Sequence, residues 1–66
     1  MGAYRLYFVN SKDAFEGFES SEHLDDQDAI RHAHALLATH PHTDAVEIWA
    51  AKRMVAKVSR NPAAPG

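Results

Sequence analysis

Histidine is the residue type best suited to chemistry in this chain, which contains His23, His32, His34, His40 and His42. Two of them, His32 and His34, would lie about 200° apart around a helix, so they cannot hold one metal ion together. The loop pair His40 and His42 could supply two ligands with Asp44 as a third, but a tetrahedral site needs three or four groups in defined geometry. We therefore predict no metal site and no cofactor. Instead, we expect His40 to be structural, near a helix C-terminus where an imidazolium complements the dipole.

Carboxylates are the second candidate for chemistry, since residues 13–28 contain seven acids and no Lys or Arg. A catalytic acid needs burial or a like charge beside it in a pocket, so a solvated, helix-capping role explains these acids better. The four serines lack the context of a nucleophile elbow, and no Ser/His/Asp arrangement can be argued from the order of residues. A single helix on a sheet also leaves little room for a pocket of about 300–1,000 Å³. We predict that the chain is not an enzyme and has no catalytic residues.

Length and charge restrict the class of protein further. The 66 residues carry a net charge of −2, which gives no general attraction to nucleic acid or anionic lipid. Residues 45–66, however, have a net charge of +3, so they could complement the acidic segment within one fold or between two copies. A chain this short buries only about 60% of its unfolded surface, and without cysteine no disulfide supports it. A second copy would relieve this shortage of core.

The start of the chain has no secretory signal, and no apolar run approaches the roughly 20 residues of a membrane span. The expected location is therefore cytoplasmic, with no membrane partner.

Residues 3–9 are rich in aromatic and branched side chains and predict a strand, with Tyr4, Leu6 and Phe8 on one face. The composition of residues 10–13 is typical of a turn, so residues 15–23 are expected to return as a weak edge strand. Because this segment contains Gly17 and many polar residues, the sequence leaves open whether it is a strand at all.

A helix is predicted to begin after Asp25, whose carboxylate can cap its first turn. Its apolar stripe would span about 120° of the helix surface. It consists of Ala29, Ile30, Ala33, Leu36 and Leu37. The helix should end near Thr39, because Pro41 disfavours helical geometry at the residue before it.

Residues 44–50 and 53–59 predict a second hairpin around Ala51 and Lys52. The turn lacks Gly, Asn and Asp, which makes a two-residue type I′ connection unfavourable and favours a loop of three or four residues. A three-residue loop places Val46, Ile48, Met54, Ala56 and Val58 on one face, whereas a loop of two or four residues reverses the faces of the second strand. We favour the three-residue loop, which sets Glu47 beside Arg53.

The order strand, weak strand, helix, strand, strand predicts an α+β fold in which one helix packs on one face of a three- or four-stranded antiparallel sheet (ββαββ). Residues 1–60 would form this single domain, and residues 61–66 a disordered C-terminal tail.

The chain resembles short bacterial ββαββ proteins of unknown function. The resemblance rests on the aromatic strand at residues 4–8, the helix start at residues 25–30, the Glu-Ile-Trp segment at residues 47–49 and the basic Arg53. The layout is more loosely similar to the HicB-type antitoxin fold, which implies a dimeric or partner-binding module, although the DNA-binding tail of such antitoxins is missing. Fold alone does not imply an activity.

The sheet face turned away from the helix is the most informative predicted feature. It would consist of Arg5, Tyr7, Val9, Trp49, Arg53, Val55 and Lys57, with no part of the chain left to cover it. Exposed aromatic patches of this kind mark interaction sites. We predict a non-catalytic module that self-associates through this face or a strand edge. Two alternatives stay open: side chains that pack only on one another, and single-stranded nucleic acid stacking on Tyr7 and Trp49.

Overall fold

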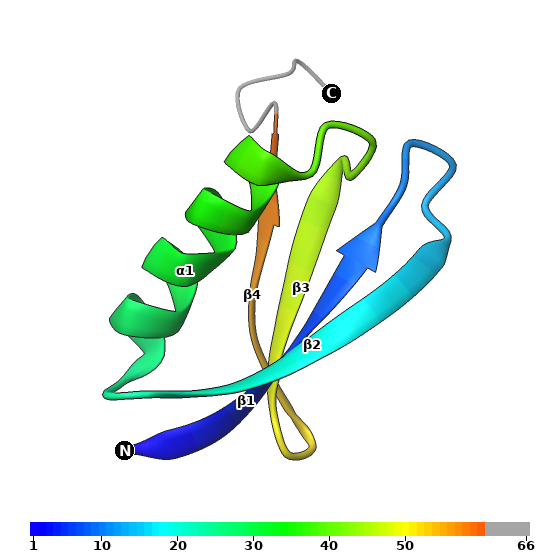
Figure 1. The fold of residues 1–66 in the computed structure, drawn as a ribbon. Helices are drawn as coiled ribbons and strands as arrows, with labels where there is room; N and C mark the ends of the chain where they lie inside the picture. The colour runs from blue at the N-terminus through cyan, green and yellow to red at the C-terminus, as the bar shows by residue number, and fades with distance from the viewer. Residues whose placement is uncertain (61–66) are drawn as a thin grey trace.

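The computed structural model describes residues 1–60, and these form four strands and one helix. The elements in chain order are β1 (Gly2–Val9), β2 (Phe15–His23), α1 (Asp26–Thr39), β3 (Ala45–Ala50) and β4 (Arg53–Ser59). The strands make one antiparallel sheet in the order β2-β1-β3-β4, and α1 lies across one face of it (Figure 1). The α+β prediction is confirmed with four strands, and residues 15–23 are one of them. The predicted tail at 61–66 lies outside the described residues.

The first hairpin is closed by the turn residues that the sequence places at 10–13. The side-chain oxygen of Asn10 accepts hydrogen bonds from the backbone N–H groups of Lys12 and Ala14, at 2.9 and 3.1 Å. Asp13 has a positive φ of 62°, a conformation that Asp tolerates better than most residues. This turn sets β2 against β1, which leaves β1 as an inner strand between β2 and β3.

The helix begins and ends with the contacts that its sequence predicts. The Asp25 carboxylate accepts a 2.9 Å hydrogen bond from the N–H of Asp28, as an N-cap should. After Thr39, the imidazole of His40 donates to the carbonyl of Leu36 at 2.8 Å, which confirms a structural role at the helix end. In the part of the chain that the structure describes, no helix is long and apolar enough to cross a membrane.

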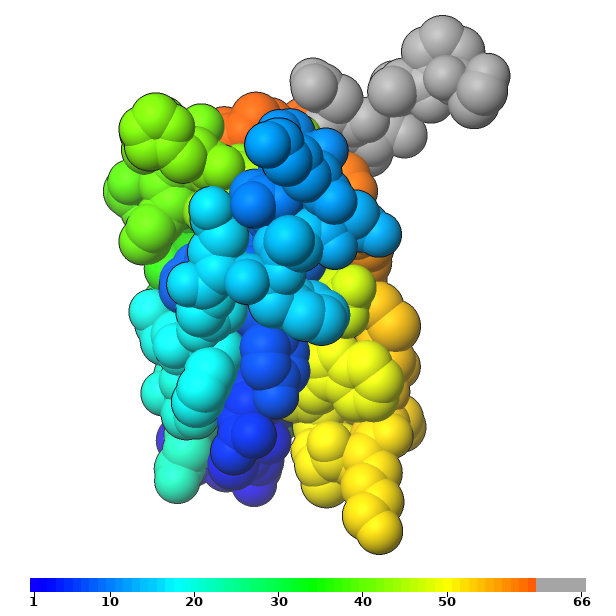
Figure 2. Space-filling model, turned by 90° about the vertical axis from the view of Figure 1, so that its right-hand side faces the viewer, coloured from blue at the N-terminus to red at the C-terminus, as the bar shows by residue number. Residues whose placement is uncertain are grey.

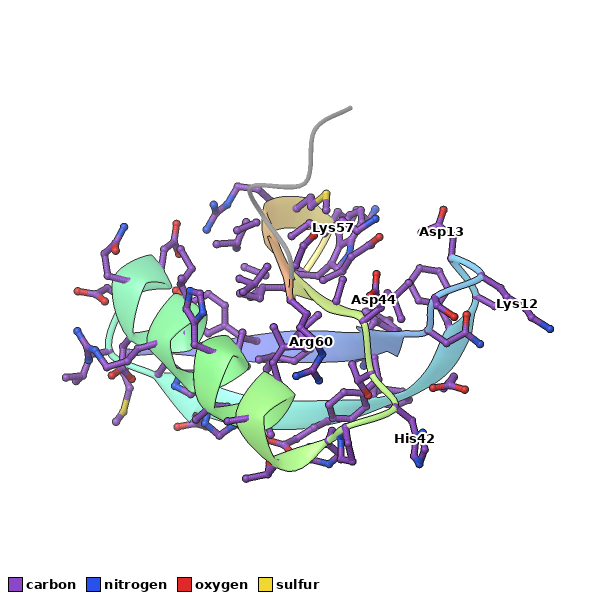
Figure 3. All side chains as sticks on the ribbon, turned by 90° about the horizontal axis from the view of Figure 1, so that it is seen from above. Lys12, Asp13, His42, Asp44, Lys57 and Arg60 are labelled. Carbon is purple, nitrogen blue, oxygen red and sulfur yellow. The ribbon has the colours of Figure 1, made fainter. Side chains whose placement is uncertain are left out.

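Arg60 adds a contact at the C-terminal end of α1 that the sequence did not indicate. Its guanidinium donates to the carbonyls of Leu37, His40 and Thr43, at 2.8, 2.7 and 2.7 Å. Figure 3 shows Arg60 pointing toward the helix. The residue after β4 therefore satisfies carbonyl groups that a helix end leaves without partners.

The core lies between α1 and the sheet. The helix contributes the buried residues Ala29, Ala33, Leu36 and Leu37, as the apolar stripe predicts. The sheet contributes Tyr4, Leu6, Val46, Ile48 and Val58 to the same cluster. Small alanines on the helix allow a close approach to the larger side chains of the strands, so a few branched residues suffice for this core.

The second hairpin corrects the predicted loop length. Ala50 pairs with Arg53, so the connection is the two residues Ala51 and Lys52, and only Ala51 has a positive φ, of 56°. A two-residue loop alone would reverse the faces of β4. A bulge at Val55 reverses them again, so that Ala56 faces Ile48 and Lys57 faces Glu47. The predicted faces of residues 56–58 are therefore right, although the predicted loop is wrong.

Candidate interaction surface

The sheet face turned away from α1 carries aromatic and charged side chains from all four strands. We call this surface the outer face. It consists of Arg5 and Tyr7 on β1, Phe15 and Phe18 on β2, Trp49 on β3, and Met54 and Lys57 on β4, as the register of cross-strand partners places them. Figure 2 looks onto this side, where β1 lies between the side chains of β2 and those of β3 and β4.

Three aromatic rings and a guanidinium form a connected cluster on the outer face. The Tyr7 ring lies 5.4 Å from that of Phe15 and 5.5 Å from that of Phe18, measured between centroids. The Arg5 guanidinium lies 4.9 Å above the Phe18 ring and donates to the Tyr7 hydroxyl at 3.3 Å. Phe15 and Phe18 nevertheless remain 61% and 55% exposed. The cluster is held in one arrangement while much of its apolar surface stays in contact with water.

The outer face also contains an open hollow of about 700 Å³. Its lining includes Arg5, Tyr7, Phe15 and Trp49. This volume corrects the expectation that one helix and one sheet leave little room for a pocket. The hollow lies on the sheet surface, outside the core, so it can receive a side chain or a strand from a partner.

Four of the seven residues predicted for this face lie together on this surface: Arg5, Tyr7, Trp49 and Lys57. Arg53 does not, because its guanidinium reaches Asp26 at the start of α1. Val55 does not, because the two-residue loop places it on the helix side, where it packs against the core. Val9, predicted to be uncovered, is only 2% exposed, between Phe15 of β2 and Ala45 of β3 in the register.

Sequence reasoning missed Phe15 and Phe18 as members of the surface. Phe18 is the register partner of Tyr7, and Phe15 that of Val9. In a regular strand these two residues, three positions apart, would point to opposite faces. The bulge at Glu16 brings both onto the outer face, and the order of residues carries no signal for that bulge.

Charged side chains of both signs surround the aromatic cluster. Lys57 pairs with Asp13 across the outer face at 3.3 Å, and Figure 3 shows both on the side of the sheet away from α1. Trp49 donates from its indole N–H to the Glu47 carboxylate at 3.2 Å. The surface therefore has no single sign of charge, and its tryptophan is oriented by a hydrogen bond.

Arg53 belongs to a network on the helix side of the sheet. Asp26 accepts a 2.7 Å hydrogen bond from the Tyr4 hydroxyl and two from Arg53, at 3.2 and 3.3 Å. The hydrogen bonds from Arg53 and from Tyr4 hold the pKa of Asp26 below its usual value. The same bond to Asp26, together with burial, raises the pKa of the Tyr4 hydroxyl. One carboxylate thus joins β1, α1 and β4.

A cluster of histidines joins β2 to α1. His23 is buried; its Nδ1 donates to Asp28 at 3.0 Å, and its Nε2 lies 2.8 Å from the Ser21 hydroxyl. His32 donates to Glu19 at 2.7 Å, and the two imidazole rings lie 5.0 Å apart. The hydrogen bond from His23 is the main cause that lowers the pKa of Asp28. These pairs tie an edge strand to the helix.

Ser21, His23 and Asp28 have the hydrogen-bond order of a hydrolase triad, an arrangement that the order of residues did not reveal. A hydrolase also needs donors that stabilise an oxyanion beside the serine. The neighbouring cation, Arg31, is engaged by Asp28 at 3.1 Å. The adjacent hollow measures only about 290 Å³. The three residues therefore have the hydrogen-bond geometry of a nucleophile and its base beside a small hollow.

The histidines do not gather into a metal site in the described range. Within residues 1–60, no three or more His, Asp or Glu side chains are arranged to hold an ion. His40 stacks on Phe8, with ring centroids 4.9 Å apart, in addition to its bond to Leu36. Its partners are thus structural ones.

Comparison with known proteins adds no further guide to the site. No family model matches this chain, and no curated protein or solved structure matches it either. The resemblance to short bacterial ββαββ proteins and to HicB-type antitoxins therefore stays a prediction.

Proposed function

We propose that this chain is a non-catalytic protein-interaction module that self-associates through its outer face. The supporting observation is the cluster of Tyr7, Phe15 and Phe18, with Arg5 above it, on a sheet face that α1 does not cover. Apolar ring surface in contact with water provides a driving force for association, because association removes that surface from water.

The residue types on the outer face favour a protein partner. Tyr, Trp and Arg are enriched among the few residues that dominate the binding energy at protein interfaces. Arg5 is already oriented by Phe18 and Tyr7, and the Trp49 indole is held by Glu47, so ordering these side chains on binding costs little entropy. Such preorganisation makes the surface suitable for binding without further folding.

A second copy of the chain is the proposed partner. The domain is small, and a copy that covers the outer face would add the apolar burial that a chain of this length lacks. In a two-fold dimer the same patch meets itself, so basic groups such as Arg5 can lie opposite acidic groups such as Glu47. A surface with both signs of charge is compatible with this self-complementary arrangement.

Single-stranded nucleic acid is the less favoured occupant. Asp13 already pairs with Lys57, and Glu47 lies beside Trp49, so carboxylates would oppose a phosphate backbone at this surface. A cytoplasmic location is part of the same proposal, since a chain without cysteine gains nothing from an oxidising compartment.

Sedimentation over a concentration series, with the emission of the single tryptophan recorded in parallel, tests the proposal. We expect dimers to form as concentration rises and the Trp49 emission to shift to shorter wavelength. A variant carrying Phe15→Thr and Phe18→Thr retains residues that favour strands but loses two rings, and its association should weaken by about tenfold or more.

Leu24→Thr is the matched control, because Leu24 is 70% exposed and lies outside the outer face. It should associate like the unchanged chain. The proposal is wrong if the unchanged chain stays monomeric at every concentration, or if Leu24→Thr weakens association as much as the double variant. Quenching of Trp49 by a short single-stranded oligonucleotide, reversed by salt, would replace it with the nucleic-acid alternative.

A further inference from the structure

The two edges of the sheet carry opposite charge. The sheet order places β2 at one edge and β4 at the other. β2 contains Glu16, Glu19 and Glu22 and no basic residue apart from His23. β4 contains Arg53 and Lys57 and no acidic residue. An edge strand offers unpaired backbone groups to another strand, and its charges decide which strands can approach.

Like edges are kept apart by these charges. If β2 paired with β2 of another copy, glutamates would face glutamates, and if β4 paired with β4, basic residues would face basic residues. Like charges on directly opposite residues destabilise a strand pair. Pairing between β2 of one copy and β4 of another has the reverse effect, because acidic residues then face basic ones.

The strand directions allow this mixed pairing. β2 and β3 both run antiparallel to β1, and β4 runs antiparallel to β3, so β2 and β4 run in opposite directions. A neighbour's β2 set beside β4 therefore continues the antiparallel alternation, with the helices of both copies on the same face. Figure 1 shows α1 across one face of the sheet, with β2 and β4 as its two edge strands.

The side chains that would meet lie on the same face. Glu22 is the register partner of Ala3, and Lys57 that of Glu47, which places both charged groups on the outer-face side. A register with Glu22 opposite Lys57 thus keeps the two outer faces continuous. The Lys57 ammonium already donates to Asp13 at 3.3 Å, and its other two protons remain for Glu22 of the neighbouring copy. The bulges in β2 and at Val55 of β4 limit the regular part of each edge, so the pairing is short and reversible.

We infer that copies of this chain associate head to tail, with β2 of one copy pairing antiparallel with β4 of the next. The inference uses the sheet edges and does not depend on the function proposed for the outer face. Because each copy keeps one free edge of each sign, the assembly grows until it closes into a ring or continues as a chain.

Charge reversal tests the pairing. Glu22→Lys and Lys57→Glu should each weaken concentration-dependent association by about fivefold, since each replaces an attraction with a repulsion. The chain carrying both changes has edges of opposite charge once more, and it should recover association close to that of the unchanged chain. Added salt should weaken the association of the unchanged chain and that of the double variant to the same extent.

Amide hydrogen exchange separates edge pairing from contact through the outer face. Edge pairing should increase the protection of alternate amides in β2 and β4 as concentration rises, and the Phe15→Thr, Phe18→Thr chain should keep this increase. The inference is overturned if edge protection does not change with concentration, if the double charge variant does not recover, or if loss of the two rings removes the edge protection.

Circular dichroism of each variant checks that it is folded, because Lys57→Glu also places a carboxylate opposite Glu47. If that variant does not fold, Lys57→Gln takes its place, since it removes the attraction to Glu22 without adding a carboxylate, and it should still weaken association.

Discussion

At the scale of single residues, Asp26 connects three elements, since this carboxylate at the start of α1 binds side chains from β1 and β4. Its lowered pKa links this contact to pH. A carboxyl group with a lower pKa in the folded state stabilises the fold above its unfolded pKa. That stabilisation is lost as pH falls through the folded value.

Asp26→Asn should therefore lower the urea midpoint of unfolding at neutral pH and much less in acid, well below pH of about 4, where the unchanged carboxyl is itself protonated. Asparagine has nearly the same shape, so the comparison isolates the charge. If the urea midpoints of Asp26→Asn and the unchanged chain differ equally at neutral and acidic pH, the charge of Asp26 does not stabilise the fold.

Ser21 provides a second residue-level prediction, about catalysis. If the chain is non-catalytic, Ser21→Ala should hydrolyse p-nitrophenyl acetate at the same rate as the unchanged chain, with any activity in both due to exposed imidazoles. The assay is a stopped-time absorbance measurement at several protein concentrations. A rate that falls markedly in Ser21→Ala would mean that Ser21, His23 and Asp28 act as a nucleophilic site.

Single residues were predictable where the signal was local. Asp25 as a helix cap and His40 at the helix end follow from neighbouring residues in the chain. Arg53 was not predictable, because its partner Asp26 lies 27 positions away, and only the fold brings the two together. The Ser21 and Asp28 contacts with His23 depend in the same way on how β2 meets α1.

At the scale of elements, the turn between β3 and β4 contains a local conflict. Ala51 adopts a φ of 56°, which is unfavourable for a residue with a Cβ atom. Ala51→Gly should raise the free energy of unfolding by about 0.5–1 kcal/mol, as measured by urea denaturation.

Lys52→Gly is the control for that change, since Lys52 lies in the same turn but has no positive φ. There glycine only adds freedom to the unfolded chain, so stability should fall slightly or stay unchanged. Equal effects at the two positions would show that backbone strain at Ala51 is not the cause.

Elements differ in how far sequence determines them. The helix bounds came from the cap, the apolar stripe and Pro41, and each of these acts within a few residues. The second hairpin needed two facts that patterning does not give, a two-residue loop without a turn signal and a compensating bulge at Val55. Arg53, Met54 and Val55 were assigned to the wrong faces for that one reason, and Met54 lies opposite Trp49 on the outer face.

At the scale of the whole molecule, the core depends on few side chains. Leu6 lies on the inner strand β1 and is fully buried among the residues of the core cluster. Leu6→Ala should lower the free energy of unfolding by about 2–5 kcal/mol. A domain this small has little more stability than that to lose, so we expect a large fall in melting temperature or complete unfolding, seen by circular dichroism.

Leu24→Ala removes the same side chain from an exposed position, and it should change stability by less than about 0.5 kcal/mol. Similar losses at Leu6 and Leu24 would contradict a core placed between α1 and the sheet.

The global layout was accessible from sequence because alternation in β1 and β3 separates the two sheet faces. That alternation correctly places Leu6 and Ile48 on the helix side of the sheet, and Tyr7 and Trp49 on the outer face. The extent of the outer face could not be predicted, since Phe15 and Phe18 join it only through the pairing of β2 with β1.

The bulge at Val55 has a consequence for which changes in chain length the second hairpin can accept. The register gives Val55 no partner of its own, because Trp49 pairs with Met54 and Ile48 with Ala56. Deleting Val55 alone should therefore remove the bulge and keep Lys57 opposite Glu47 and Val58 in the core. β4 can absorb the loss of one residue in this way, whereas deleting Ala56 as well would place Lys57 opposite Ile48, on the helix side of the sheet.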